Sequence, residues 1–143
     1  MEQYIEFAGN HPFLLFSFAA VFGLLVWNIF GEKLQGFESI DPQQAIMMIN
    51  HDDALVVDVR EDNEFKEGHI ANAMHIPLGM LSDKISRLEK HRDKTIIMSC
   101  RSGNRSGVAC GKLKKEGFEK IYNLRGGVIA WQGANLPLTK GKN

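Results

Sequence analysis

The sequence predicts an α/β domain with a mainly parallel sheet, preceded by one N-terminal transmembrane helix. Two observations support this fold class. Residues 12–30 form an uncharged, almost wholly apolar run. Beyond residue 37, short apolar runs alternate with helical patterns, which is typical of strands joined by crossover helices in a parallel sheet. We therefore divide the 143 residues into an N-terminal segment at 1–31, a linker at 32–37 and one domain at 38–143.

The apolar run has the length of a membrane span. As a helix, its 19 residues extend about 28 Å, close to the hydrocarbon thickness of a bilayer. Pro12 suits the first turn of such a helix, because the N–H that proline lacks would be unpaired there. A cleaved signal peptide and a buried core helix are the alternatives. A signal peptide would have basic residues ahead of its apolar core, whereas this chain has Glu2 and Glu6.

The distribution of charge predicts topology and partners. The chain has 17 basic and 17 acidic side chains, and Lys33 is the first basic one. Because basic residues stay on the cytoplasmic side, we expect a single-pass protein of the inner (plasma) membrane with its domain in the cytoplasm. The weak positive surplus of the domain gives no reason to expect a nucleic-acid partner, which needs a clustered basic face. Two cysteines are too few for a secreted disulfide scaffold, and the Cys and His residues do not have zinc spacing, so no metal site is expected.

The first half of the domain shows two helices and two strands. Asp41, followed by Pro42 and Gln44, has the form of a helix start with an N-cap, a proline in the first turn and a capping-box partner. The β-branched run at 55–59 predicts a buried strand, and the polar segment at 61–67 predicts a short helix ended by Gly68. Residues 74–76 predict a weaker strand that Pro77 stops.

The second half continues this alternation. Leu81, Ile85 and Leu88 are spaced by four and three residues, which predicts a helix with one apolar face. Residues 95–99 and 120–124 are predicted as buried strands. Between them, residues 106–115 are predicted as a helix closed by Gly117, and a last short helix is expected to begin at Val128.

The segment CRSGNRS, at residues 100–106, follows a predicted buried strand and opens a helix. Ligands of open parallel sheets bind beyond the carboxyl ends of the strands, so this position predicts a site. Gly103 allows a tight turn, and successive N–H groups of such a loop can point at one anion. The following helix adds the positive end of its dipole. We therefore expect Cys100 to be a thiolate nucleophile at neutral pH.

The residues that follow Cys100 supply charge and hydrogen bonds. Arg101 and Arg105 place fixed positive charge beside the sulfur, which favours an anionic substrate. Ser102 and Ser106 can donate hydrogen bonds. The predicted substrate-binding residues are Arg101, Ser102, Gly103, Asn104, Arg105 and Ser106. Cys110 lies inside the predicted helix and is interpreted as a buried apolar residue.

This loop and the chain around it closely resemble rhodanese-like domains, over about residues 37–138. The matching pieces are Val57-Asp58-Val59-Arg60, EFKEGHI at 64–70, ANA at 71–73 leading to Ile76-Pro77, the loop at 100–106, Gly117-Phe118, and LRGG at 124–127 leading to Ala130-Trp131. Each piece alone is weakly specific, but the whole set in this order is highly specific for the family.

The resemblance implies a five-stranded parallel sheet flanked by helices. It also implies transfer of sulfane sulfur through a cysteine persulfide, without a cofactor. The persulfide would form on Cys100, held by the loop backbone at 101–105. The partners would be a sulfur donor such as thiosulfate and a thiol or protein acceptor. Asp58 and Arg60 match a strand-end pair of the family, which we expect to be a buried ion pair that holds the neighbouring loop.

Two alternative functions stay open. Cysteine-based phosphatases and arsenate reductases use related folds, so the fold does not exclude them. Their loops place five residues between cysteine and arginine, whereas four separate Cys100 from Arg105, which suits a single sulfur atom. Ser99 also stands where such phosphatases commonly have histidine. The other alternative is a membrane-tethered module that binds a membrane-protein partner and has little catalysis.

Overall fold

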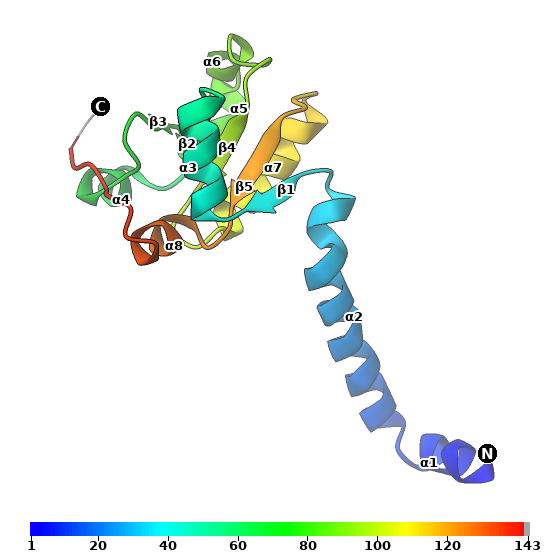
Figure 1. Cartoon of the computed structure of the whole chain (residues 1–143). Coiled ribbons are helices and arrows are strands. Elements are labelled where there is room, and N and C mark those ends of the chain that lie inside the picture. Colours follow the sequence, from blue (N-terminus) through cyan, green and yellow to red (C-terminus); the bar gives the residue numbers. More distant parts are fainter. Residues whose placement is uncertain (142–143) are drawn as a thin grey trace. The chain divides into compact units, whose positions relative to one another are not determined.

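The computed structural model describes residues 1–141, and the chain divides into two compact units, Met1–Leu34 and the part from Gln35 onward (Figure 1). The first unit contains the helices α1 (Glu2–Asn10) and α2 (Pro12–Leu34). Within α2, the 20 residues Pro12–Gly31 are long and apolar enough to cross a membrane. Pro12 is the first residue of α2, in the position where proline is best tolerated.

Helix α2 extends into the segment at 32–37 that is predicted as a linker. Helix α2 continues past Gly31 to Leu34, and α1 precedes it where the sequence had suggested no element. Lys33 lies in the last turn of α2, where a positive charge is favourable beside the negative end of the helix dipole. Gly36 then has a φ of +78°, a left-handed conformation that glycine adopts readily and that commonly follows a helix end.

From residue 35 to residue 141, five strands form one parallel sheet in the order β1-β5-β4-β2-β3. The strands are β1 (Glu38–Ile40), β2 (Leu55–Asp58), β3 (Met74–His75), β4 (Ile96–Ser99) and β5 (Ile121–Leu124). The predicted α/β class with a five-stranded parallel sheet is therefore confirmed. The patterns missed β1, because three residues are too few to show an alternation; its place is fixed by pairing with β5, where Ser39 lies opposite Asn123.

Helices cover both faces of this sheet, as Figure 1 shows. One apolar core lies under α7 (Asn104–Lys115) and the short helices η1 (Leu78–Met80), α5 (Leu81–Lys84) and α6 (Ser86–Glu89). The other lies under α3 (Pro42–His51), α4 (Asp62–Glu67) and α8 (Gly127–Gly133). Because both faces are buried, the strands read as continuous apolar runs rather than as alternating ones.

The helices follow the sequence patterns with two differences. The capping box at the start of α3 is present: the Asp41 carboxylate accepts from the Gln44 N–H at 2.9 Å, and the Gln44 side chain accepts from the Asp41 N–H at 3.0 Å. The helix predicted around Ile85 is divided there into α5 and α6, although Ile85 keeps helical angles of φ −61° and ψ −29°. Helix α7 begins at Asn104, earlier than predicted, so the site loop is only a few residues long.

Candidate active site

Cys100 is the first residue after β4, a strand with neighbours on both sides. Only 1% of its surface is exposed. The chain turns from Cys100 into α7 through Gly103, which has a φ of +100°. A Cβ atom at Gly103 would also lie 3.3 Å from the Gly126 nitrogen, closer than nine in ten such contacts. The left-handed backbone conformation and the tight space both favour glycine at this point of the loop.

Hydrogen-bond donors converge on the Cys100 sulfur. The Gly103 N–H donates to Sγ at 3.1 Å, and the Ser106 hydroxyl lies 3.3 Å from it. Burial raises the pKa of the Cys100 thiol, but the Ser106 hydroxyl and the N–H groups of Ser106, Gly103 and Ser102 outweigh that effect, so the pKa lies below its ordinary value. This is the environment of a nucleophilic thiolate.

A buried asparagine in β5 contacts the residues that supply these donors. The Asn123 Nδ2 group donates to the Gly103 carbonyl at 3.1 Å and to Ser39 Oγ at 3.3 Å, while Ser106 Oγ lies 2.6 Å from Asn123 Oδ1. Asn123 is 3% exposed. Asn123 was not predicted as a site residue from the sequence. The available signal was a polar residue in an otherwise apolar strand, just before the Gly126-Gly127 pair.

Helix α8 packs against the backbone of the same loop. The Val128 N–H donates to the Cys100 carbonyl at 2.8 Å, and the Ile129 N–H donates to the Arg101 carbonyl at 3.2 Å. Gly127, with a φ of +56°, makes this approach possible. A Cβ atom there would lie 2.3 Å from the Cys100 carbonyl oxygen, which no side chain can do.

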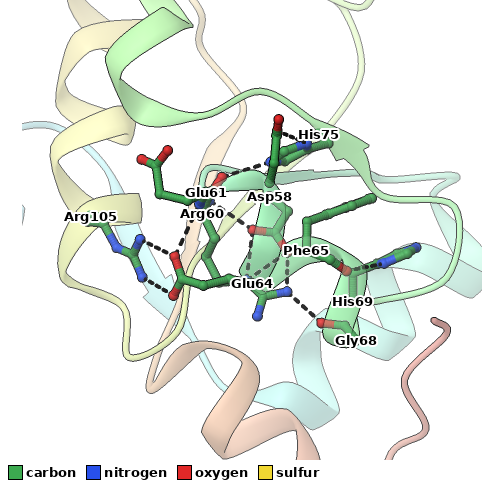
Figure 2. Close-up of polar contacts among 10 residues, drawn as sticks. Asp58, Arg60, Glu61, Glu64, Phe65, Gly68, His69, His75 and Arg105 are labelled. Carbon is green, nitrogen blue, oxygen red and sulfur yellow. Dashed lines mark hydrogen bonds and ion pairs between the residues drawn. The ribbon is translucent and has the colours of Figure 1, made fainter. Parts of the chain in front are cut away.

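Arg105 is not an unpaired cation. Its guanidinium makes two hydrogen bonds to the Glu64 carboxylate of α4, at 2.7 and 2.8 Å (Figure 2). These bonds lower the pKa of Glu64 to about 2 and raise that of Arg105, so both groups are charged at neutral pH. Glu64 lies in a motif noted in the sequence, but its pairing with α7 could not be read from spacing because 41 residues separate the two.

The other predicted loop residues divide into exposed and buried ones. Arg101, Ser102 and Asn104 are exposed, whereas Ser106 is fully buried beneath the sulfur. Arg101 also lines a cavity of about 270 Å³, together with Glu67 and Gln132. A larger cavity of about 610 Å³ lies elsewhere, along β3, and no loop residue lines it. The site is therefore identified by its chemistry rather than by the size of a cavity.

Asp58 and Arg60 form the expected ion pair at the end of β2. Arg60 donates to both carboxylate oxygens of Asp58, with a shortest distance of 2.8 Å, and to the Gly68 carbonyl at 2.7 Å (Figure 2). Both side chains are almost completely buried. The pair joins β2 to the end of α4, the helix that presents Glu64 to Arg105.

Two further side chains with reactive atoms, His69 and Cys110, are buried. His69 is buried, with its ring stacked on Phe65 at 3.7 Å and its Nδ1 atom 2.7 Å from the Phe65 carbonyl. Cys110 is buried within α7, and its sulfur lies 3.5 Å from the Tyr122 carbonyl. These contacts agree with structural roles for both residues.

Comparison with known proteins agrees with this geometry. The sequence signature described as Rhodanese-like domain matches residues 41–134. The uncharacterised protein YibN of Escherichia coli K12 is 34% identical over 143 residues, which cover 99% of this chain and 100% of YibN. A sulfurtransferase of Allochromatium vinosum is 39% identical over 87 residues, covering 61% of this chain and 79% of that protein.

A solved structure shows the same fold. The crystal structure of a rhodanese-related protein from Thermoplasma volcanium superposes with a TM-score of 0.67 and 33% identity, covering 73% of this chain and all of that one. The resemblance found in the sequence motifs is thereby confirmed by the signature, the relatives and the fold. The chain belongs to the rhodanese-like domain family.

Proposed function

We propose that this chain is a sulfurtransferase that carries sulfane sulfur as a persulfide on Cys100. The main support is the environment of the Cys100 sulfur, where converging hydrogen-bond donors lower the pKa despite burial. The name of the Allochromatium vinosum relative, a sulfurtransferase, is further support. Cys110 is placed differently: it lies within α7, and its sulfur faces the Tyr122 carbonyl of β5, which is an acceptor and does not stabilise a thiolate.

The proposed reaction has two steps. The Cys100 thiolate attacks the outer sulfur of thiosulfate; the new S–S bond forms as the old one breaks, and sulfite leaves with the bonding electron pair. An acceptor such as cyanide or a thiolate then attacks the outer sulfur of the persulfide. The Cys100–sulfur bond breaks, its electron pair returns to Sγ, and the thiolate is restored.

Different residues of the loop have different roles in these steps. Gly103 and Ser106 contact the sulfur itself, so they stabilise its anionic form. The exposed residues Arg101, Ser102 and Asn104 are the ones that an incoming donor can reach. Arg105 is already compensated by Glu64, so we assign the larger share of anion binding to Arg101.

Mass spectrometry tests this proposal directly. Full-length protein in detergent, treated with thiosulfate, should gain about 32 Da, one sulfur atom, on the Cys100 peptide. The gain should vanish in Cys100→Ser and persist in Cys110→Ser, and thiosulfate:cyanide turnover should follow the same pattern. An adduct on Cys110, or turnover in Cys100→Ser, would disprove the assignment. A folded protein with neither adduct nor turnover would favour a binding module.

We further propose that α2 anchors the domain at 38–143 to the inner membrane. The length and apolar composition of Pro12–Gly31 support this, as does the absence of basic residues from the sequence before Lys33. The chain should then stay in the membrane fraction after washing with high salt or carbonate. Release by these washes would contradict an anchor, and a mature protein that lacks the first thirty residues by mass would identify a signal sequence.

A further inference from the structure

The Ser106 hydroxyl lies between two groups that can accept its single proton. Asn123 Oδ1 is 2.6 Å from Ser106 Oγ, and Cys100 Sγ is 3.3 Å from it. All three side chains are at least 97% buried. A hydroxyl has one proton, so it cannot donate fully to both neighbours.

The surroundings of Asn123 fix which way its amide points. The Gly103 carbonyl can only accept, so the Asn123 atom that faces it at 3.1 Å is the Nδ2 donor. The amide oxygen therefore faces Ser106 and can only accept from it. At 2.6 Å this is the shorter of the two contacts, and the Ser106 proton lies toward Asn123 while the sulfur is uncharged.

The neutral thiol and the thiolate of Cys100 need different hydrogen-bond arrangements. A neutral thiol has its own proton and can donate it to the lone pairs of Ser106. A thiolate has none and only accepts. The Gly103 N–H already donates to Sγ, and the Ser106 hydroxyl can add a second hydrogen bond only by turning from Asn123 to Sγ. The hydrogen bond to Asn123 is lost in that turn, which makes ionisation of Cys100 harder than it would be without the asparagine.

We propose that Asn123 is a positioning residue that holds the Ser106 proton away from Cys100 while the sulfur is uncharged and releases it when the sulfur becomes anionic. For the transfer step this rests on the proposed function. The inner sulfur of a persulfide is uncharged, and Sγ regains a full negative charge when the acceptor removes the outer sulfur. Ser106 then reorients to that charge, and no proton leaves the hydroxyl.

Charged groups around the loop are unaffected by substitutions at Asn123 or Ser106. They are Arg101, Arg105 with its partner Glu64, the Asp58–Arg60 pair and Arg125. Each substitution described below exchanges one neutral side chain for another, so every variant contains the same set of charged groups. A change in the ionisation of Cys100 in those variants therefore reports on hydrogen bonding rather than on an altered field.

The test is the pH dependence of Cys100 alkylation by iodoacetamide, measured on full-length protein in detergent and quantified on the Cys100 peptide. Asn123→Leu, which has similar size and no acceptor, should move the midpoint of the profile down by about half to one pH unit. Ser106→Ala should move it up. In the Ser106→Ala background, Asn123→Leu should have no further effect. Ser39→Ala, which removes another partner of Asn123 and leaves Oδ1 in place, is the matched control and should leave the midpoint unchanged.

A midpoint that rises or stays constant in Asn123→Leu, or a shift that persists without the Ser106 hydroxyl, would overturn the proposal. If Asn123→Leu does not fold, the infrared S–H stretch of the wild-type protein at low pH gives the same decision. The band that disappears on alkylation of Cys100 should be displaced to the frequency of a donating thiol, and a band at the frequency of a non-bonded thiol contradicts the arrangement. Neither measurement needs sulfur transfer, so the outcome is independent of the thiosulfate experiment.

Discussion

The positive charge of Arg105 is compensated within the protein by the Glu64 carboxylate. Its two hydrogen bonds to Glu64 link α7 to α4. Arg101, four positions before Arg105 in the chain, is exposed. Two arginines that look equivalent in the sequence therefore have different tasks, one holding two helices together and one facing the solvent beside the sulfur.

This difference predicts separate effects of the two arginines on catalysis. Arg101→Ala should raise the KM for thiosulfate by about tenfold and leave stability unchanged, because it removes the charge-assisted contact that we propose between Arg101 and thiosulfate. Arg105→Ala should lower both stability and turnover, and Glu64→Gln combined with it should restore part of the stability. Steady-state kinetics and urea unfolding measure these effects, with the exposed Arg87→Ala as control. Equal effects of Arg101→Ala and Arg105→Ala on both quantities would contradict the division.

The Glu64–Arg105 pair should also make stability depend on acid pH. The pKa of Glu64 is about 2 in the folded protein and 4.5 ordinarily, so the folded state favours the carboxylate. The pair therefore stabilises the protein above pH 4.5, and this contribution is lost as the pH falls from there toward 2. Glu64→Gln should cost about 1 kcal/mol at pH 7, since both side chains are partly exposed, and nothing near pH 2. Urea unfolding at several pH values tests this, with Glu67→Gln in the same helix as the control.

Single residues were predictable where chemistry is local. Cys100, Gly103 and Ser106 follow one another around a turn, so their convergence could be inferred from the order of residue types. Asn123 and Glu64 reach the same loop from β5 and α4. Both residues are far from the loop in the sequence, so their contacts with it cannot be predicted from spacing and arise only when the sheet is folded.

Among the elements, α8 determines how the loop is held from outside. The N–H groups of Val128 and Ile129 donate to the carbonyls of Cys100 and Arg101. The helix can approach the loop this closely because Gly127 has no side chain. Gly127→Ala should lower stability by at least about 2 kcal/mol, through left-handed strain and overlap with the Cys100 carbonyl, and should reduce alkylation and sulfur transfer together.

Gly133→Ala is the matched control in the same helix. A Cβ atom at Gly133 meets no heavy atom within 4 Å in the described structure, so this change should be neutral or add up to about 1 kcal/mol. Thermal unfolding of the two variants side by side provides the comparison. A Gly127→Ala protein as stable and active as Gly133→Ala would show that the close contact has no role.

Elements with a strong local signal were predictable, and those that depend on distant contacts were not. The capping box of α3 and the runs of β2 and β4 have their signals within a few residues. Strand β1 has only three residues and exists through its pairing with β5. Helix α2 extends past the apolar run to Leu34, because helical conformation does not require apolar side chains.

At the scale of the whole molecule, the division into two compact units predicts that the domain folds without the N-terminal helices. The chain from Gln35 onward contains the complete sheet and both apolar cores, so it should fold and be soluble without α1 and α2. Circular dichroism and the pH profile of Cys100 alkylation should match those of the full-length protein. An unfolded fragment would mean that the N-terminal unit supplies contacts on which the domain depends.

The orientation of the chain in the membrane is predicted by a single charge. Lys33 is the only basic residue close to either end of the apolar segment, while Glu2 and Glu6 precede it. Because basic residues resist translocation, the domain should stay in the cytoplasm, where the Cys100 thiol remains reduced. A fluorescent protein fused to the C-terminus should then be bright and a phosphatase fused there inactive.

Lys33→Gln combined with Glu2→Lys and Glu6→Lys reverses the charge difference and should produce mixed or inverted orientation, which appears as phosphatase activity. An active phosphatase on the wild-type chain would place the sulfur-bearing loop outside the cytoplasm, and the thiol chemistry proposed for Cys100 would then need a reducing system in that compartment.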